Sequence, residues 1–344
     1  KQSETYLKAI YALGALLRSN FHNDESEPYF KESQHLAETL GNKQLLADTL
    51  NQLAGIAWAK GNLETSNDLL NQSLDIKREL GDKRGVAISL ENLALLAKLQ
   101  KNYDLAKTLY FEASEVYTAL ADDTLRANTL RNVGRALMFE GNFNEAQKYM
   151  QESLSIFEQL PNQKRLAQVQ NDLACIICHK GDFDLALDLL EKSSTLAKDY
   201  GNKRDLANVL HSFGLLSYSK NRFEEASAYF QEGLQLAYEV KDVKGIGSAL
   251  EGLASVVAQK SDFLLAAKLW GASANLAYDL ESVKIFLNTH YESDVANVKN
   301  ALGELAFSEH FKKGQALSVD DVISLVLDSS ENVGKNIKRR EIDD

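Results

Sequence analysis

The 344-residue chain has few of the residues that interrupt helices or cross-link chains. It contains two prolines, Pro28 and Pro161, and two cysteines, Cys175 and Cys178. Because proline removes a backbone donor and clashes within a helix, its scarcity favours uninterrupted helices. The two cysteines lie so close in the sequence that a disulfide within one straight helix is geometrically unfavourable.

Long apolar segments and a basic excess are also absent from the sequence. No apolar run approaches the roughly 18 residues of a membrane span, and the N-terminus lacks the charged and apolar regions of a signal peptide. The formal net charge of −11 argues against a nucleic-acid-binding groove, which normally carries a basic excess. These features predict a cytoplasmic location and no binding of nucleic acid or membrane by this segment.

Motifs for catalysis and cofactor binding are missing as well. There is no phosphate-cradling G-x-x-x-x-G-K loop and no H-E-x-x-H zinc helix. The six histidines are scattered without a supporting triad motif. Carboxylate pairs such as Glu224-Glu225 are explained as first-turn residues that the helix dipole favours. We therefore expect no enzyme, no cofactor and no metal site.

One local match needs an explanation, because Cys175-Ile176-Ile177-Cys178-His179 fits the haem-attachment pattern C-x-x-C-H. The repeat register places these residues on a helix beside core positions, and the equivalent residues of neighbouring repeats share no metal ligands. Ordinary helix residues are therefore the preferred interpretation. Redox sensing and metal binding remain the alternatives.

The main feature of the sequence is a unit of forty residues that is repeated along the chain. One turn signal ends each unit, and a second lies halfway through it, typically Gly followed by Asn or Asp, which can also cap the next helix. Self-similarity at a period between twenty and fifty residues is the signature of a solenoid. The unit ends are Leu40-Gly41, Leu80-Gly81, Leu120-Ala121, Leu160-Pro161, Tyr200-Gly201, Val240-Lys241 and Leu280-Glu281.

Each half of the unit carries a helical pattern of apolar residues. In the first half Leu50, Leu53, Ala54 and Ala57 share one helix face. The third rung of this ladder is Ala or Gly in the copies, which implies that a second helix lies close to it. The second half alternates large and small residues, as interlocking helices require. Each unit is therefore predicted to be a helical hairpin that must stack on its neighbours.

The order of Leu, small residue, turn, Ala, aromatic and small residue resembles the tetratricopeptide repeat, in a forty-residue variant. Two features depart from that family. The early Trp position holds Leu, as at Leu50 and Leu90, and the terminal Pro is missing except for Pro161. The resemblance implies an all-α fold, a right-handed superhelical solenoid of helical hairpins. It also implies that the first helices of successive hairpins line a concave groove.

Three regions are expected along the chain. Residues 1–280 form the array of about seven repeats. The first of these is degenerate, because the polar stretch 22–28 replaces its turn and its second helix resumes around Tyr29. Residues 281–327 form capping helices, which the end of a solenoid needs. Residues 328–344 are polar and lack periodicity, and we expect them to be disordered.

A second resemblance covers residues 41–327, and its most distinctive motifs lie in the C-terminal part of the chain. It resembles the C-terminal end of large bacterial ATP-dependent signalling proteins of the STAND class, including LuxR-family and SARP-type regulators. In that group a nucleotide-binding switch domain precedes a tetratricopeptide array that acts as the sensor arm. The resemblance implies that this chain, which begins without Met, is such an arm. It depends on Leu269-Trp270-Gly271-Ala272, Tyr291-Glu292, Ala301-Leu302-Gly303-Glu304-Leu305-Ala306-Phe307, Gly314-Gln315-Ala316-Leu317-Ser318 and Asp321-Val322.

By the first resemblance, the non-core positions of the first helices face the groove. Asn side chains offer both a donor and an acceptor to a peptide backbone, so the ladder Asn92, Asn132, Asp172 suits an extended peptide. The cations Arg131 and Arg135 are candidates for pairing with an acidic group or a C-terminal carboxylate. For any one position, a solvated helix surface is the alternative. The candidate partner-binding residues are Asn51, Trp58, Asn92, Asn128, Arg131, Asn132, Arg135, Asn171, Asp172, Asn208, His211 and Tyr218.

Three functions follow from these patterns. The first is the sensor arm of a bacterial signal-transduction ATPase or transcriptional regulator that binds a protein, a peptide or a small effector in its groove. The second is a free-standing adaptor that mediates protein–protein interactions. The third, an enzyme built into the groove, lacks a nucleophile or metal constellation. Replacing Arg131 and Arg135 together with Ala is predicted to weaken partner binding without changing helicity or melting.

Overall fold

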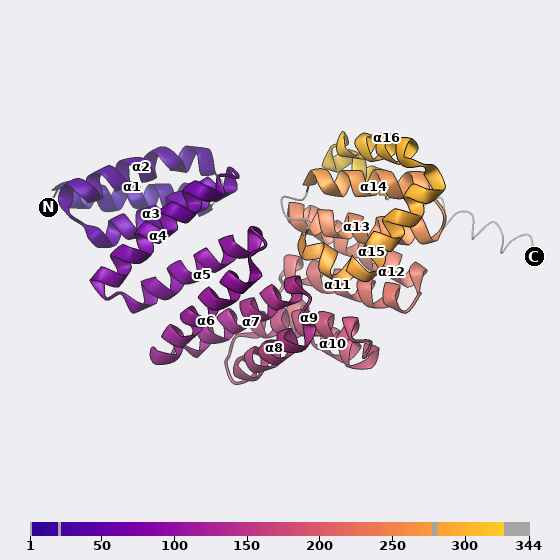
Figure 1. Ribbon diagram of the computed structural model, residues 1–344, viewed down its shortest axis with the longest axis horizontal. Coiled ribbons are helices and arrows are strands. Elements are labelled where there is room, and N and C mark those ends of the chain that lie inside the picture. Colours follow the sequence, from indigo (N-terminus) through magenta and orange to yellow (C-terminus); the bar gives the residue numbers. More distant parts are fainter. Residues whose placement is uncertain (1, 20–21, 277–280, 327–344) are drawn as a thin grey trace, which may run out of the picture. The chain divides into compact units, whose positions relative to one another are not determined.

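The computed structural model describes residues 2–19, 22–276 and 281–326, and every regular element in these ranges is a helix (Figure 1). The chain divides into two compact units, Lys1–Glu140 (unit 1) and Gly141–Asp344 (unit 2). Within each unit, helices that follow one another in the sequence pack against each other. The predicted all-α solenoid of stacked helical hairpins is therefore confirmed within each unit.

Unit 1 consists of helices that alternate between the first and the second member of a hairpin. The first helices, which the groove prediction concerns, are α3, α5 and α7. Helices α3 and α5 each pack on the second helices before and after them, and α7 packs on α6. The helices are α1 (Gln2–Ser19), α2 (Asn23–Leu40), α3 (Lys43–Ala59), α4 (Leu63–Leu80), α5 (Lys83–Leu99), α6 (Tyr103–Ala119) and α7 (Asp123–Glu140).

Unit 2 continues the same alternation, with α9, α11 and α13 as first helices, and then departs from it. Helix α15 packs on α13 and α14, and α16 packs on α14 and α15. The helices are α8 (Phe143–Glu158), α9 (Gln163–His179), α10 (Phe183–Asp199), α11 (Lys203–Ser219), α12 (Phe223–Glu239), α13 (Val243–Gln259), α14 (Phe263–Leu276), α15 (Glu281–Leu302) and α16 (Glu304–Gln315), followed by a helical stretch at 319–326.

Asn and Asp side chains begin many of the helices. The Asn62 Oδ1 accepts the backbone N–H of Thr65 at 3.2 Å, and the Asp182 Oδ1 accepts that of Leu185 at 3.2 Å. These bonds satisfy donors that the first turn leaves without a partner, and they confirm the predicted cap role. The residue before the cap has a positive φ, 78° at Gly61, which glycine adopts without steric cost.

The small third rung of the first helices lies against an aromatic ring of the second helix. A Cβ added to Gly14 would lie 3.1 Å from the Phe30 ring, and one added to Gly214 would lie 2.5 Å from the Phe230 ring. Both rings are buried. The close approach that the sequence predicted at this rung is therefore confirmed, since a larger side chain would separate the two helices.

The predicted loop at residues 22–28 is wrong, because α2 already begins at Asn23 and includes Pro28. The Ser26 N–H donates to the His22 carbonyl at 3.0 Å, which starts the helical bonding before the proline. Pro28 is exposed, as is Asp24, whose carbonyl is the one left without the i+4 donor. Water can therefore satisfy that carbonyl, and the helix continues through the proline.

The helices that follow α13 pack at very short range. A Cβ on Gly271 of α14 would collide with the backbone of Phe311 on α16, and a Cβ on Gly314 of α16 would collide with the backbone of Lys268. Trp270 is buried, and its ring meets that of Tyr291 edge-on at 5.7 Å. The sequence segments that carry the second resemblance therefore contact each other. The proposed boundaries 1–280 and 281–327 remain predictions, and the tail 328–344 lies outside the described residues.

Candidate binding groove

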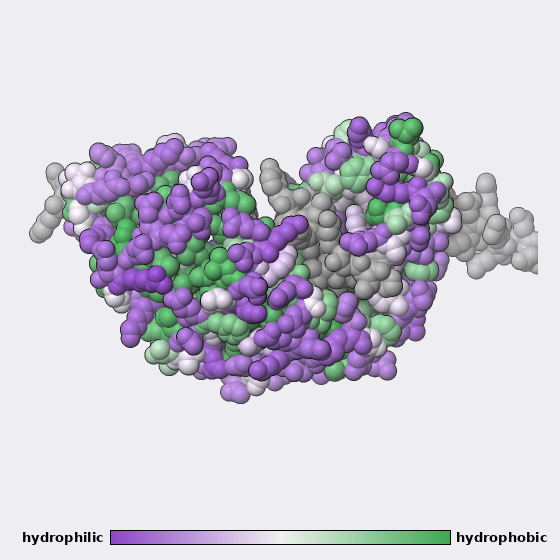
Figure 2. Space-filling model, in the orientation of Figure 1, coloured by the Kyte–Doolittle hydropathy of each residue, from purple (hydrophilic) through white to green (hydrophobic). Residues whose placement is uncertain are grey.

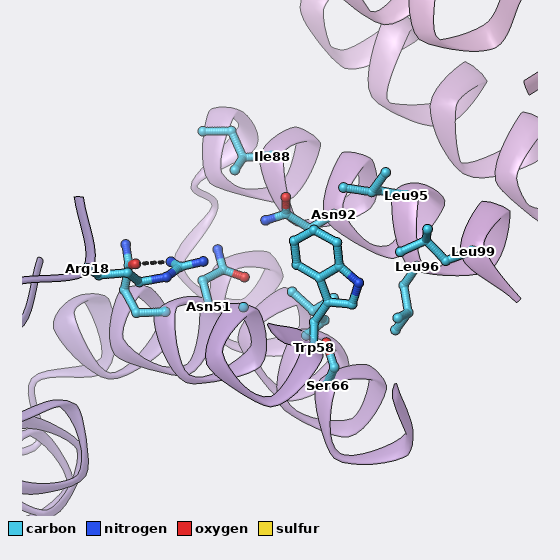
Figure 3. A pocket seen from close by; sticks show the side chains of 12 residues that line it. Arg18, Asn51, Trp58, Ser66, Ile88, Asn92, Leu95, Leu96 and Leu99 are labelled. Atoms are coloured by element: carbon cyan, nitrogen blue, oxygen red, sulfur yellow. Dashed lines mark hydrogen bonds between the residues drawn. The ribbon is translucent and has the colours of Figure 1, made fainter. Parts of the chain in front are cut away.

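Unit 1 has two adjoining cavities along the row of its first helices. The first has a volume of about 240 Å³ and lies between α3 and α5, with α1 and α4 contributing (Figure 3). The second, about 260 Å³, lies between α5 and α7, with Tyr110 of α6 at its base. Asn92 and Leu95 line both. We call the first the apolar cavity, the second the polar cavity and the pair the unit 1 groove.

The apolar cavity is lined mainly by hydrocarbon side chains. Figure 3 shows Trp58 pointing from α3 toward Asn92 and the leucines of α5. Trp58 is 44% exposed and Ile88 is 39% exposed, high values for large apolar residues. Figure 2 shows a hydrophobic patch over α4 and α5, bordered by hydrophilic residues. Exposed apolar surface framed by polar residues is typical of an interaction site.

Arg18 of α1 borders the apolar cavity and is fixed there by its neighbours. Its guanidinium donates a hydrogen bond to the Gln52 Oε1 and lies against Gly55, at a point where a Cβ would displace it. Burial lowers the pKa of Arg18 from its usual value. Gln52 also donates to the Tyr11 hydroxyl at 3.5 Å. Part of the hydrogen-bonding capacity of the Arg18 guanidinium is therefore already taken up by Gln52.

The polar cavity is lined by three amides and two cations. The amides are Asn92 of α5 and Asn128 and Asn132 of α7, and the cations are Lys98 and Arg135. The Lys98 Nζ lies 4.8 Å from the centre of the Phe139 ring, within reach of a cation–π interaction.

Glu91 also lines the polar cavity, and its carboxylate accepts hydrogen bonds from two hydroxyl groups. The Tyr117 hydroxyl donates to its Oε2 at 3.0 Å, and the Thr129 hydroxyl donates to its Oε1 at 2.7 Å. Burial, and then the charge of Glu91, raise the pKa of Tyr117. Glu91 thus links α5 to α6 and α7, and its carboxylate is engaged within the fold.

One polar group of the apolar cavity lacks an internal partner. The Oδ1 atom of Asn51 is buried and accepts no hydrogen bond from the described residues. Leaving such a group unsatisfied costs about 1–3 kcal/mol, so a site of this kind calls for an explanation such as a bound group. The amide of Asn51 lines the cavity, where a ligand can bond to it after rotation of the side chain.

The structure brings six of the seven unit 1 candidates to this groove, namely Asn51, Trp58, Asn92, Asn128, Asn132 and Arg135. Arg131 is the exception. It is 9% exposed and lies outside both cavity linings. Its polar type suggested a surface position, but the structure places it beside the core. Replacing it is therefore expected to affect stability, so Arg135 alone is the cleaner test.

The unit 2 candidates occupy a different environment. Asn208 is exposed, Asn171 and Asp172 are half-buried, and the Oδ1 of Asn171 is buried without a partner among the described residues. His211 packs 5.3 Å from the Phe230 ring, and burial lowers its pKa to about 4.

Tyr218 is 4% exposed because α15 covers it. Its hydroxyl donates to the Asp294 Oδ2 at 2.6 Å, and the Gln259 amide donates to the Asp294 Oδ1 at 2.6 Å and to the Tyr218 oxygen at 3.0 Å. Asp294 is itself 3% exposed. Burial, and then the hydrogen bond to Asp294, raise the pKa of Tyr218. This buried network fixes α15 across α11 and α13.

The C-x-x-C-H motif makes ordinary packing contacts. The Cys175 Sγ lies 3.3 Å from the Ser212 Oγ, and the His179 ring stacks on Phe143 at 3.7 Å. Burial raises the pKa of the Cys178 thiol, which makes it less nucleophilic. Across the described ranges no group of three or more His, Cys, Asp or Glu side chains is placed to hold a metal ion.

The sequence interpretation missed Arg18, Gln52 and Ile88 as lining residues. The forty-residue register carried a signal for two of them. Arg18 occupies the register position of Trp58, and Gln52 that of Asn92. Ile88 was missed because its apolar side chain resembles a core residue.

Residues 85–159 and 165–239 match the family model of the tetratricopeptide repeat. These two segments are tetratricopeptide repeats. No curated protein matches the chain. Among the described residues, no helix has both the length and the hydropathy needed to cross a bilayer.

Solved structures with similar folds extend over most of the chain. Aspartyl phosphate phosphatase F from Bacillus subtilis has a TM-score of 0.68 at 14% identity, covering 82% of this chain and 72% of that one. A Rap protein complexed with Competence and Sporulation Factor has a TM-score of 0.56 at 14% identity, covering 98% and 99%. A STAND protein with a tetratricopeptide repeat sensor from Pyrococcus horikoshii has a TM-score of 0.56 at 15% identity, covering 88% and 50%. At these identities the likeness concerns the fold.

Proposed function

We propose that the chain is a non-catalytic protein-interaction module whose unit 1 groove binds an extended segment of a partner protein or peptide. The observation that carries this proposal is the row formed by Asn51, Trp58 and Asn92. It combines an exposed indole, an amide with a buried oxygen lacking a partner, and a second amide shared by two cavities. Amide side chains can bond to any peptide backbone, and the indole supplies apolar contact.

The size of the cavities favours a peptide over a small-molecule effector. Each cavity, at about 240 and 260 Å³, is smaller than the roughly 300–1,000 Å³ typical of sites that enclose drug-sized ligands. Two small cavities that share a wall suit successive side chains of one chain. An extended segment also leaves its backbone groups accessible to the amides that line the groove.

We further propose that this module is the sensor arm of a bacterial STAND-type signalling ATPase or transcriptional regulator, located in the cytoplasm. The C-terminal sequence resemblance supports this context, and the fold it shares with a STAND protein that has a tetratricopeptide repeat sensor is compatible with it. The alternative is a free-standing adaptor. An upstream nucleotide-binding domain in the complete gene would favour the sensor arm, and its absence would favour the adaptor.

The binding proposal is tested by capturing partners with the wild-type chain and with Trp58→Ala. Leu105→Ala is the matched control, because Leu105 is also 44% exposed and lies on α6 outside both cavity linings. Loss of a buried aromatic anchor typically costs 2 kcal/mol or more, which corresponds to about thirtyfold weaker binding. We expect that loss for Trp58→Ala alone. Equal retention of every captured partner by both variants would contradict the assignment.

A further inference from the structure

We infer that the unit 1 groove selects an extended segment with one large apolar side chain and, three residues away, an acidic side chain. This inference rests on the proposed function, because it names the chemistry of the segment that the groove binds. Three properties of the groove lead to this inference. They are the apolar walls of the apolar cavity, the guanidinium of Arg135 in the polar cavity and the distance between the two cavities.

The apolar cavity has room for one large side chain. Trp58, Ile88 and Leu99 form apolar walls around about 240 Å³. The exposed fractions of Trp58 and Ile88, 44% and 39%, show how much apolar surface an occupant can remove from water. Burying a Leu or Phe side chain there removes apolar surface from water and so favours binding.

The polar cavity favours a carboxylate because its own carboxylate is already engaged. Glu91 accepts the hydroxyl groups of Tyr117 and Thr129. Arg135, by contrast, forms no ion pair with a carboxylate of the described residues. A guanidinium can bind a carboxylate through two parallel hydrogen bonds. In a chain with a net charge of −11, the cavity sets the two cations Arg135 and Lys98 against the one carboxylate of Glu91, so its lining carries a net positive charge that favours an acidic residue.

The spacing of the two cavities sets the spacing of the two side chains. One cavity lies between α3 and α5 and the other between α5 and α7, on either side of α5, so their centres are separated by about the width of one helix with its side chains, roughly 10 Å. A polyproline II segment rises about 3.1 Å per residue with three residues per turn. Side chains three residues apart therefore lie about 9 Å apart on one side of it. The segment between them crosses Asn92, whose amide can bond to its backbone.

The carboxylate is assigned to an acidic side chain within the segment and not to a free C-terminus. Asn128 and Asn132 lie on the same helix as Arg135 and line the same cavity. Their amides can pair with backbone groups on both sides of the carboxylate, which an internal residue supplies and a chain end does not.

The test is a selection of random dodecapeptides on the immobilised full chain. One library has its peptide C-termini blocked by fusion to a carrier, and a second has them free. We expect the blocked library to yield peptides with a large apolar residue and Asp or Glu three residues away. On Arg135→Gln the acidic preference should disappear while the apolar preference remains. On Trp58→Ala the apolar preference should disappear.

A selected peptide then provides the affinity measurement. Losing one charge-assisted hydrogen-bonded pair should weaken its binding to Arg135→Gln about tenfold or more. The matched control is Arg78→Gln, since Arg78 pairs with Glu112 at 3.0 Å on the exposed surface of unit 1. Arg135→Lys should retain the acidic preference with lower affinity, because it keeps the charge but loses the fork.

The outcomes separate this inference from the proposed function. Peptides that require Trp58 but show no acid, an acid at another spacing, or enrichment only with a free C-terminus would overturn the inference and leave the groove function intact. If no peptide is enriched above the level of a Trp58→Ala, Asn92→Ala double variant, both fail.

Discussion

Unit 1 and unit 2 follow the same forty-residue register, yet their first helices pack differently. In unit 2, α9 contacts α11, and α11 contacts α13. In unit 1, α3, α5 and α7 make at most marginal contacts with one another and leave two cavities between them. The same hairpin architecture thus produces an open groove in one unit and a closed row of helices in the other.

Side-chain size at one register position explains much of this difference. The position holds the amides Gln52, Asn92 and Asn132 in unit 1, and Asp172, Ser212 and Gly252 in unit 2. The short side chain of Ser212 allows α9 and α11 to meet, with Sγ to Oγ contact at 3.3 Å to Cys175. Gly252 packs against a second helix, since a Cβ there would lie 2.5 Å from the Phe230 ring of α12. The short side chain of Ser212 lets two first helices approach, whereas the amides of unit 1 line a groove.

The second difference between the units is what covers their first helices. In unit 2 the chain's own α15 packs on α13, and Tyr218 of α11, at the register position of Trp58, donates a hydrogen bond to Asp294 of α15. In unit 1 Trp58 remains 44% exposed. Trp58 and Trp270 are also the two tryptophans of the chain, one in each unit, so each unit carries its own fluorescent side chain.

The largest effect is expected at the glycines where helices cross. The Gly314→Ala variant should lower the free energy of unfolding of unit 2 by about 3 kcal/mol, because its Cβ meets rigid backbone of α14. The Gly55→Ala variant in unit 1 should cost less than about 1 kcal/mol, because its Cβ meets the flexible end of Arg18. Urea unfolding followed by tryptophan fluorescence measures both. Equal losses would mean that close helix crossing does not distinguish the units.

The Tyr218→Phe variant should lower the free energy of unfolding of unit 2 by a smaller amount, about 2 kcal/mol, because the buried carboxylate of Asp294 loses a hydrogen bond of 2.6 Å. Tyr238→Phe is the control. That tyrosine donates to Asp320 at 2.7 Å on an exposed surface, and its loss should change stability by less than about 0.5 kcal/mol. Hydrogen exchange of the α15 amides is the readout. If both variants exchange like the wild type, α15 is not held by this network.

The pH dependence of unit 2 should carry a contribution from His211. Burial lowers the pKa of His211 to about 4 from an ordinary value of 6.5, so between these values the unfolded chain binds more protons than the folded one. This contribution to stability is therefore complete above about pH 6.5 and falls by about 3 kcal/mol as the pH drops to 4. His211→Gln should flatten that part of the profile, measured by Trp270 fluorescence. A profile that is unchanged in the variant would refute the assignment.

The sequence predicted the hairpins and most of the unit 1 groove because both depend on local periodicity. The positions of Asn92, Asn132 and Arg135 follow from the register alone, and so do the helix caps such as Asn62. The register would also have identified Arg18 and Gln52.

The remaining features depend on contacts that a repeat pattern does not contain. Tyr218 was expected to face the groove, but Asp294 lies on a non-repeating helix that no register relates to it. Arg131 is adjacent in sequence to a core residue, Leu130, and its polar type concealed its burial. Pro28 belongs to the polar stretch that was expected to replace a turn, although its exposed position permits the helix to continue through it.

The central claim is that the same register position is open in unit 1 and closed in unit 2, and thiol labelling tests it most directly. Arg135 and Cys175 occupy equivalent positions, with Arg135 lining a cavity and Cys175 7% exposed. In the Arg135→Cys variant, we expect position 135 to react with a maleimide at the rate of an accessible thiol, while Cys175 reacts only after urea unfolding. Equal rates at the two positions in the folded protein, measured by mass spectrometry of the labelled peptides, would contradict the account.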